Sequence, residues 1–261
     1  MAPHQEPLIQ STRHGAVLHL ALNRPAKRNA VNDALIEALD QAFSALPKDV
    51  RAVVLTGNGD QFCAGLDLSE LTERNVFEGI LHSRGWHVAL DRVQFAPVPV
   101  VAVLHGAVVG GGLEIAASCH VRVAETNAFY AFPEGQRGIF VGGGGSVRVP
   151  RLIGAARVAD MMLTGRVLDA QEGQAMGLSN YLVEPGAGLA KGLALAERIA
   201  ANAPMSNYAV IQALPRIAEL APAEGLFMES LVAAIAQGEP AAKERLRAFL
   251  EKRAGKVAKE S

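Results

Sequence analysis

The sequence contains very little cysteine. Only two of its 261 residues are cysteines, Cys63 and Cys119, and both lie inside apolar stretches. Two cysteines cannot form the dense disulfide framework of a small secreted domain, so we expect two reduced, buried thiols in a cytoplasmic protein. A chain of this length can bury a sizeable hydrophobic core, either as one large domain or as one domain with a small appendage.

The sequence also lacks an excess of charge of either sign. Lys and Arg together number 25 and Asp and Glu 26, which leaves a formal net charge of -1. Such a chain has no general basic field that could attract a polyanion or an anionic lipid surface. We therefore expect neither nucleic acid nor a membrane as a partner.

Long apolar runs and targeting signals are missing as well. The longest apolar stretch, residues 98–109, is interrupted by Pro99, His105 and Gly106. No run approaches the roughly 18 apolar residues of a membrane-spanning helix. The first seven residues lack the apolar core of a signal peptide, so we expect none. Since no His/Cys/Asp cluster has ligand spacing, we also expect no metal site.

Strand and helix patterns alternate through most of the chain. We predict strands at about residues 8–12, 16–22, 51–56, 100–104, 121–124, 128–132 and 179–183. We predict helices at about residues 33–46, 70–94, 113–118, 146–152, 155–163, 169–176, 188–202, 204–219, 223–237 and 240–254. Only helices follow residue 186. We therefore expect an α/β core at 1–185 that carries the active site, and a helical region at 186–261.

A weak internal repeat suggests how the core is built. Residues 53–57 and 101–106 are each an apolar strand that ends in glycine. Each is followed by a second glycine turn, at Gly65 and at Gly110–Gly112, and then by a helix. The repeat favours stacked ββα units, although the pattern also fits a doubly wound sheet.

The glycine turn Gly110–Gly112 is the first candidate for chemistry. It lies where a strand passes into a helix, and a helix N-terminus presents unpaired N–H groups and a partial positive charge. The spacing matches neither the dinucleotide-binding glycine motif nor the P-loop. An oxyanion site is the better functional interpretation, and a tight turn with close packing is the structural alternative.

Two glutamates accompany the glycine turns. Glu114 falls in the first turn of the predicted helix, and Glu134 follows Pro133 in a loop. Each could be an ordinary surface residue. However, two carboxylates near glycine-lined helix starts suit proton transfer, because burial raises a carboxyl pKa toward a useful range.

Short motifs in a particular order connect these features with a known family. They are Leu22-Asn23-Arg24-Pro25, Phe62-Cys63-Ala64-Gly65-Leu66-Asp67, Gly106-Ala107-Val108-Val109-Gly110-Gly111-Gly112-Leu113-Glu114, Phe132-Pro133-Glu134, Leu163-Thr164-Gly165 and Ala175-Met176-Gly177-Leu178. Their order and spacing between about residues 17 and 252 resemble the crotonase superfamily, and most of all its enoyl-CoA hydratases. The resemblance implies a spiral of ββα units with C-terminal helices that assemble a homotrimer or a dimer of trimers.

The same resemblance implies roles for individual residues. The N–H groups of Leu66 and Gly111 would bind a thioester oxygen, and Glu114 and Glu134 would be the catalytic pair. The residues that would contact coenzyme A are Lys27, Ala64 and Lys252, and Gly142 would border the substrate pocket. The expected substrate is a trans-2-enoyl-CoA thioester, with no cofactor beyond the substrate's own coenzyme A. Alternatives are a Δ3-Δ2-enoyl-CoA isomerase, other enolate chemistry, or a non-catalytic binding protein.

The chain departs from the family pattern at several positions. His120 and His105 stand where the family usually has aspartate and asparagine, and Arg245 replaces a usual glycine. The tract Gly142–Gly145 is richer in glycine than in most members. We interpret both histidines as structural, and we expect the glycine tract to affect acyl specificity more than the chemistry.

Overall fold

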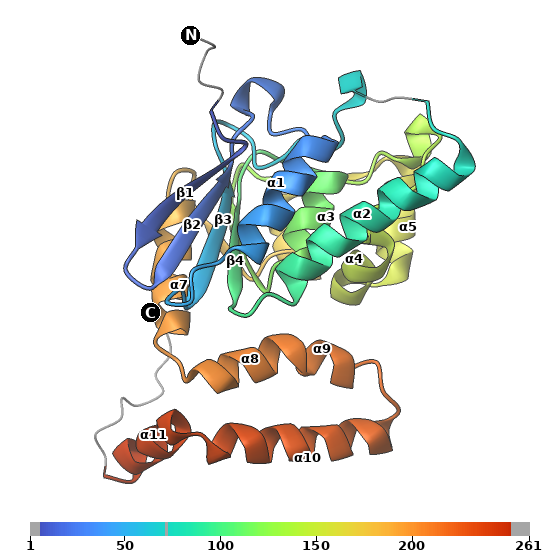
Figure 1. The fold of residues 1–261 in the computed structure, drawn as a ribbon. Coiled ribbons are helices and arrows are strands. Elements are labelled where there is room, and N and C mark those ends of the chain that lie inside the picture. The colour runs from blue at the N-terminus through green and yellow to red at the C-terminus, as the bar shows by residue number, and fades with distance from the viewer. Residues whose placement is uncertain (1–5, 71–72, 252–261) are drawn as a thin grey trace. The chain divides into compact units, whose positions relative to one another are not determined.

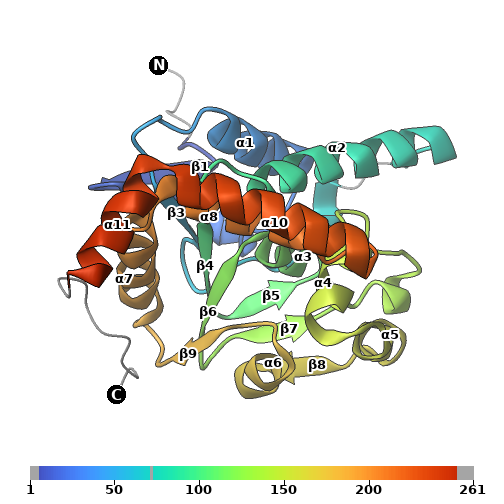
Figure 2. The same cartoon turned by 90° about the horizontal axis from the view of Figure 1, so that it is seen from below.

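Two β-sheets form the framework of the computed structural model, which describes residues 6–70 and 73–251. The main sheet has the order β1 (Ile9–His14), β2 (Val17–Leu22), β3 (Ala52–Gly57), β4 (Val100–Leu104), β6 (Val121–Glu125) and β9 (Tyr181–Val183). Only β1 runs antiparallel to its neighbour in this sheet. A smaller sheet contains β5 (Ala107–Val109), β7 (Phe129–Ala131) and β8 (Val167–Asp169). Figure 2 shows its strands crossing the direction of β4 and β6.

The two sheets are linked by repeated ββα units, so the predicted fold class is confirmed. In each unit one strand joins the main sheet, the next joins the small sheet, and a helix follows. Two complete units are β4–β5–α3, with α3 at Gly111–Ser118, and β6–β7–α4, with α4 at Gly145–Ile153. Two earlier units use single bridges in place of a second strand, Cys63 to Val108 and Val31 to Leu66.

All seven predicted strands are present, whereas β5 and β8 were not predicted. Both have only three residues, which is too short for an alternating pattern to be recognised. The strands β3 and β4 are buried along their whole length. Their continuous apolar sequence is typical of parallel strands covered on both faces.

Helices cover both faces of the main sheet (Figure 1). The helices α1 (Asp33–Ser44) and α2 (Val76–Gln94) pack against each other, and the side chain of Asn32 caps α1 as predicted by accepting the N–H of Leu35. The helices α5 (Ala155–Thr164) and α6 (Ala170–Met176) follow α4. The other face is covered by α7 (Gly188–Ala200).

The chain forms two compact units that divide between Ala200 and Ala201. The sequence-based boundary at residue 186 differs from this division, because α7 packs on β3 and β4 and so belongs to the first unit. Gly192 permits this contact, since a Cβ there would collide with Val103.

The second unit is helical in its described part. It contains α8 (Pro204–Gln212), α9 (Leu214–Ile217), α10 (Pro222–Gly238) and α11 (Pro240–Leu250). The helix predicted at 204–219 is therefore interrupted, at Ala213, just before Pro215 near the start of α9. Several apolar side chains of α10 are exposed, namely Leu226, Phe227, Met228, Leu231 and Ile235.

Two expectations about the whole chain can be compared with these elements. Cys63 and Cys119 are free and buried, as predicted. None of the helices in the described ranges combines the length and the apolar character needed to cross a membrane.

Candidate active site

A pocket of about 440 Å³ lies in the first unit, within the usual volume range of small-molecule sites. It brings together five of the residues predicted for the site: Leu66, Gly111, Glu114, Glu134 and Gly142. The rest of its wall comes mainly from α2 and from the segment 139–143.

Two glycine turns meet at one side of this pocket. Because Cys63 is paired with Val108, the turns that follow them reach the same edge of the small sheet. Both turns contain a glycine with positive φ, +94° at Gly65 and +52° at Gly110. A Cβ on Gly65 would lie only 2.9 Å from the carbonyl oxygen of Val109. Glycine is therefore required there both by backbone conformation and by space.

The turns leave two N–H groups without an acceptor. Pairing with Val31 uses the carbonyl of Gly65 and the N–H of Asp67, so the N–H of Leu66 takes no part. The N–H of Gly111 is the first of α3, and no carbonyl within that helix can accept it. In the described part of the chain neither N–H has a partner. Two such donors can stabilise a carbonyl oxygen that gains negative charge.

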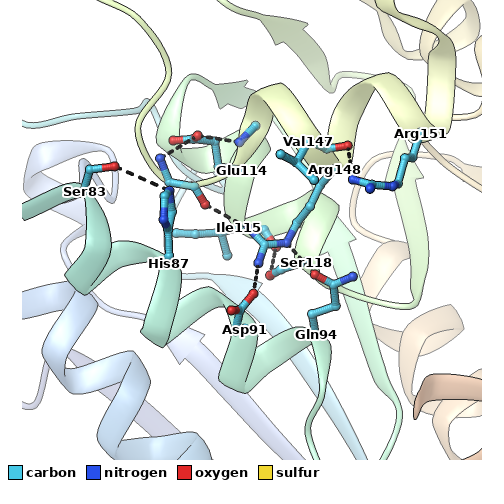
Figure 3. Close-up of polar contacts among 12 residues, drawn as sticks. Ser83, His87, Asp91, Gln94, Glu114, Ile115, Ser118, Val147, Arg148 and Arg151 are labelled. Carbon is cyan, nitrogen blue, oxygen red and sulfur yellow. Dashed lines mark hydrogen bonds and ion pairs between the residues drawn. The ribbon is translucent and has the colours of Figure 1, made fainter. Parts of the chain in front are cut away.

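Glu114 is held by the glycine tract that precedes α4. The side chain is 3% exposed, and its Oε1 accepts the N–H of Gly143 at 2.8 Å and that of Gly145 at 2.7 Å (Figure 3). A Cβ on either glycine would come within 2.9 Å of a carboxylate oxygen. Burial raises the pKa of Glu114, while these hydrogen bonds and the charge of Arg148 act in the opposite direction.

Arg148 anchors the glycine tract to α2. Its Nη1 donates to the carbonyl oxygen of Gly143 at 2.9 Å, and its Nη2 forms an ion pair with Asp91 at 2.5 Å. Its Nε donates to Oε1 of Gln94 at 2.6 Å. Figure 3 shows the guanidinium between these partners. The arginine thus fixes the backbone whose N–H groups bind Glu114.

Glu134 lies in a different environment. It is 7% exposed, and its Oε2 is buried without a hydrogen-bond partner among the described residues. Its Oε1 would lie 2.8 Å from a Cβ on Gly110. The carboxyl group is therefore next to the turn Gly110–Gly112, named the oxyanion turn below. Burial raises the pKa of Glu134 to about 7, and the negative charge of Glu114 adds to the shift. This group can therefore both release and accept a proton near neutral pH.

The helix α2 forms one wall of the pocket. The six-membered ring of Trp86 packs against the backbone of Gly111 and Gly143, where a Cβ would lie 2.9 Å and 2.8 Å from ring carbons. One turn earlier, Ser83 donates from Oγ to the carbonyl oxygen of Gly142 at 2.7 Å. The wall therefore fixes both the oxyanion turn and the glycine tract.

Two of the residues predicted to contact coenzyme A, Lys27 and Ala64, do not line this pocket. Lys27 donates from Nζ to Oγ of Ser69 at 3.0 Å, and the N–H of Ala64 donates to the carbonyl oxygen of Arg28 at 3.0 Å. The segments that carry Lys27 and Ala64 are thus packed together, and their role in binding coenzyme A stays a prediction. Lys252 lies outside the described residues.

Buried Asn29 holds the first of these segments in place. Its Nδ2 donates to the carbonyl oxygens of Asn58 and Gln61, at 2.9 and 2.7 Å. Its Oδ1 accepts the N–H of Arg24 at 2.8 Å. The Lys27 turn is therefore tied to the loop that follows β3.

The two unusual histidines form structural hydrogen bonds. His120 accepts the N–H of Val100 at Nδ1 and donates from Nε2 to the carbonyl oxygen of Gln94. Burial lowers the pKa of His120 to about 4, so the ring is neutral. His105 bonds the carbonyl oxygen of Gly59 through Nε2. Across the described ranges no group of His, Cys, Asp and Glu side chains could hold a metal ion.

Comparison with known proteins identifies the family. The family model described as enoyl-CoA hydratase/isomerase matches residues 12–259. The chain belongs to the enoyl-CoA hydratase/isomerase family. The short-chain-enoyl-CoA hydratase of Clostridium acetobutylicum is 33% identical over 92% of this chain and 94% of its own length. The 2,3-dehydroadipyl-CoA hydratase of Escherichia coli is 35% identical over 93% of this chain and 95% of its own length.

Solved structures of this family share the fold. A Rhodopseudomonas palustris protein assigned to the enoyl-CoA hydratases is 56% identical, with a TM-score of 0.93. The match covers 97% of this chain and 98% of that one. The enoyl-CoA hydratase of Mycobacterium smegmatis is 30% identical, with a TM-score of 0.91 over 96% of this chain and 99% of that one.

The contribution of α2 and of the residues just before it to this enoyl-CoA hydratase/isomerase site was not predicted from the sequence. The pocket residues Arg74, His82, Ser83 and Trp86 were missed, as was Arg148, which supports the glycine tract. The available signal was the poor amphipathic pattern of residues 70–94. Polar residues on the buried side of a helix indicate that this side faces a cavity rather than a packed core.

We predict that Glu134 titrates near pH 7 and that Glu114→Gln lowers the pKa of Glu134 by removing a neighbouring negative charge.

The raised pKa of Glu134 also predicts how stability depends on pH. This pKa in the folded protein lies above the ordinary value of 4.5, so the folded state binds the extra proton between about pH 4.5 and 7. The free energy of unfolding should therefore fall as pH rises through this window. Carboxyl ¹³C NMR and denaturant titrations would measure both effects. Identical pH profiles for the wild type and Glu134→Gln would contradict the assignment.

Proposed function

We propose that this enzyme adds water across the trans-2 double bond of an enoyl-CoA thioester and produces a 3-hydroxyacyl-CoA. The observation that carries the proposal is the meeting of two carboxyl groups, Glu114 and Glu134, with two unused N–H donors in one pocket. The match to the enoyl-CoA hydratase/isomerase family and the hydratases among its relatives support it.

The two N–H groups would act on the thioester carbonyl. Hydrogen bonds from Leu66 and Gly111 to the carbonyl oxygen withdraw electron density from C3 and stabilise the enolate that forms when water attacks there. Loss of one such donor typically costs about 2.7–4 kcal/mol of transition-state stabilisation. The pocket supplies these donors from rigid backbone, so they need no reorganisation during the reaction.

The two carboxyl groups would divide the proton transfers. Glu114, held as an acceptor by two backbone N–H groups, orients the water and takes its proton as the C3–O bond forms. Glu134, whose pKa is raised to about 7, delivers a proton to C2. The proton that Glu114 takes from water then passes to Glu134, so both carboxyl groups return to their starting states and the net reaction consumes one water. The mechanism uses no cofactor beyond the coenzyme A of the substrate.

Isomerisation is the main alternative. A Δ3-Δ2-enoyl-CoA isomerase needs one carboxylate that moves a proton between C2 and C4. Here a second carboxyl group lines the same pocket, which favours hydration. Product analysis separates the two, because only hydration yields a 3-hydroxyacyl-CoA. A non-catalytic binding protein would not need either carboxyl group.

We also propose that the protein acts in the cytoplasm as a homotrimer or a dimer of trimers. The free buried cysteines are consistent with a reducing compartment. The apolar side chains of Leu226, Phe227, Leu231 and Ile235 on α10 are 46–66% exposed in the single chain. A row of this kind is typical of a surface that another chain covers.

The first test of the function replaces each glutamate by its neutral isostere. Glu134→Gln and Glu114→Gln should each lower kcat for crotonyl-CoA hydration by about 10²–10⁴-fold, because each removes a proton-transfer group. Thioester binding should remain largely intact, as measured by calorimetry. Glu37→Gln, on the exposed side of α1, is the matched control and should keep full activity. Wild-type hydration rates in both active-site variants would refute the mechanism.

A second test uses neighbouring glycines. In Gly143→Ala the new Cβ would collide with Trp86 and the Glu114 carboxylate, so we expect kcat/KM to fall by about 10²-fold or more. In Gly142→Ala the nearest atom would be Oγ of Ser83, at 3.8 Å, so the loss should be much smaller. Steady-state kinetics on both variants measures the difference. Equal losses would show that the glycine tract does not position Glu114.

A third test concerns assembly. Sedimentation equilibrium should give a mass three or six times that of one chain. Leu231→Glu, which places a charge in the exposed apolar row of α10, should shift the protein to smaller species. A single-chain mass for the wild type would contradict the proposed assembly.

A further inference from the structure

The pocket has a polar wall that the proposed hydration does not use. Arg74, His82 and Ser83 line it together with the reaction residues. His82 lies one helical turn before Trp86, with ring centroids 6.1 Å apart, and Trp86 packs against Gly111. His82 is therefore separated from the Gly111 backbone by the Trp86 ring.

This part of the pocket would receive the acyl group rather than coenzyme A. Lys27 and Ala64, which the family resemblance assigns to coenzyme A, do not line the pocket. Besides Leu66 and Gly111, the pocket is lined by residues of α2 and by the apolar residues 139–141. An acyl chain that leaves the thioester along α2 would reach His82 and Ser83 on that helix and Arg74 just before it.

Arg74 and His82 already converge on one carboxylate. Arg74 donates from Nη2 to Oδ2 of Asp33 at 2.9 Å, and His82 donates from Nε2 to Oδ1 at 2.6 Å. The Asp33 side chain is 64% exposed, whereas those of Arg74 and His82 are only 25% exposed, so Asp33 is the outer member of the cluster. The two donors thus lie between the solvent-facing carboxylate and the pocket.

Arg74 retains donors for a second carboxylate. A guanidinium has five N–H groups and stays charged at all ordinary pH values. Among the described residues only the bond to Asp33 is found for Arg74. Guanidinium N–H groups that have no acceptor among the described residues, on the wall of a pocket, match an anionic group at the end of a ligand.

On these grounds we propose that the acyl group of the substrate ends in a carboxylate, which is bound by the N–H groups of Arg74 that Asp33 does not occupy. This inference rests on the proposed hydratase function and names its substrate class: an ω-carboxy trans-2-enoyl-CoA rather than a simple alkyl enoyl-CoA. The methylene segment between the two ends would lie against Ile139 and Phe140, and the ω-carboxylate would interact with the remaining N–H groups of Arg74.

The test compares two six-carbon trans-2-enoyl-CoA thioesters that differ only at the far end, which is a methyl group in one and a carboxylate in the other. The wild type should show a higher kcat/KM for the carboxylate substrate. Arg74→Gln should reduce the ratio of the two kcat/KM values by between about tenfold and a hundredfold, as expected for a charge-assisted hydrogen bond. Arg74→Lys, which keeps the charge but not the fork of donors, should retain part of the ratio.

Arg92→Gln is the matched control. Arg92 lies on α2 and, like Arg74, is paired with an aspartate, Asp40, but it does not line the pocket. Its replacement should leave the ratio unchanged. If the wild type hydrates both substrates equally well, or if Arg74→Gln lowers both values by the same factor, the inference fails while the hydratase function stands. If the wild type hydrates neither, the proposed function fails and the inference falls with it.

Discussion

The carboxylate of Glu114, bound by the N–H groups of Gly143 and Gly145, is the interaction on which the arrangement of the site depends. It joins the first turn of α3 to the start of α4, and Arg148 ties the same glycine backbone to α2. A buried carboxylate is tolerated only where such donors compensate for lost hydration. The Glu114 carboxylate and its partners thereby hold together α3, the glycine tract and α2.

The spiral of ββα units explains why residues distant in sequence meet here. Two successive units have glycine turns, at Gly65 and Gly110, and the bridge between Cys63 and Val108 aligns these turns. Leu66 and Gly111 thus present their N–H groups to one pocket. Glu134 enters from the next unit, just after β7, where burial next to Glu114 favours its protonated form. The environments of the two carboxyl groups differ. Glu114 has backbone donors, whereas Glu134 has a buried oxygen that finds no partner in the part of the chain that the structure describes.

Much of this site could be predicted from the sequence, because its central parts are local. Gly111 and Glu114 share one helix start, and Pro133-Glu134 is a short motif, so their positions follow from patterns within a few residues. The role of Gly143 and Gly145 as donors to Glu114 could not be predicted, since it depends on two segments about thirty residues apart folding against each other. The wall formed by Trp86 and Arg74 was missed for the same reason. The three-residue strands β5 and β8 are too short to show a period.

The proposed reaction and the proposed recognition of the acyl group use different residues of the pocket. In the proposed mechanism the backbone N–H groups and the two glutamates would act on atoms that every enoyl thioester has. In the further proposal, Arg74 and residues 139–141 would contact the acyl group, which differs from one thioester to another.

The central claim is that Leu66 and Gly111 bind the thioester oxygen, and the most direct measurement is an isotope-edited infrared difference spectrum of [1-¹³C]crotonyl-CoA bound to Glu134→Gln. Two N–H donors on the thioester oxygen should move the carbonyl stretch to a lower frequency than in water. A carbonyl band at its solution frequency would show that Leu66 and Gly111 do not bind that oxygen.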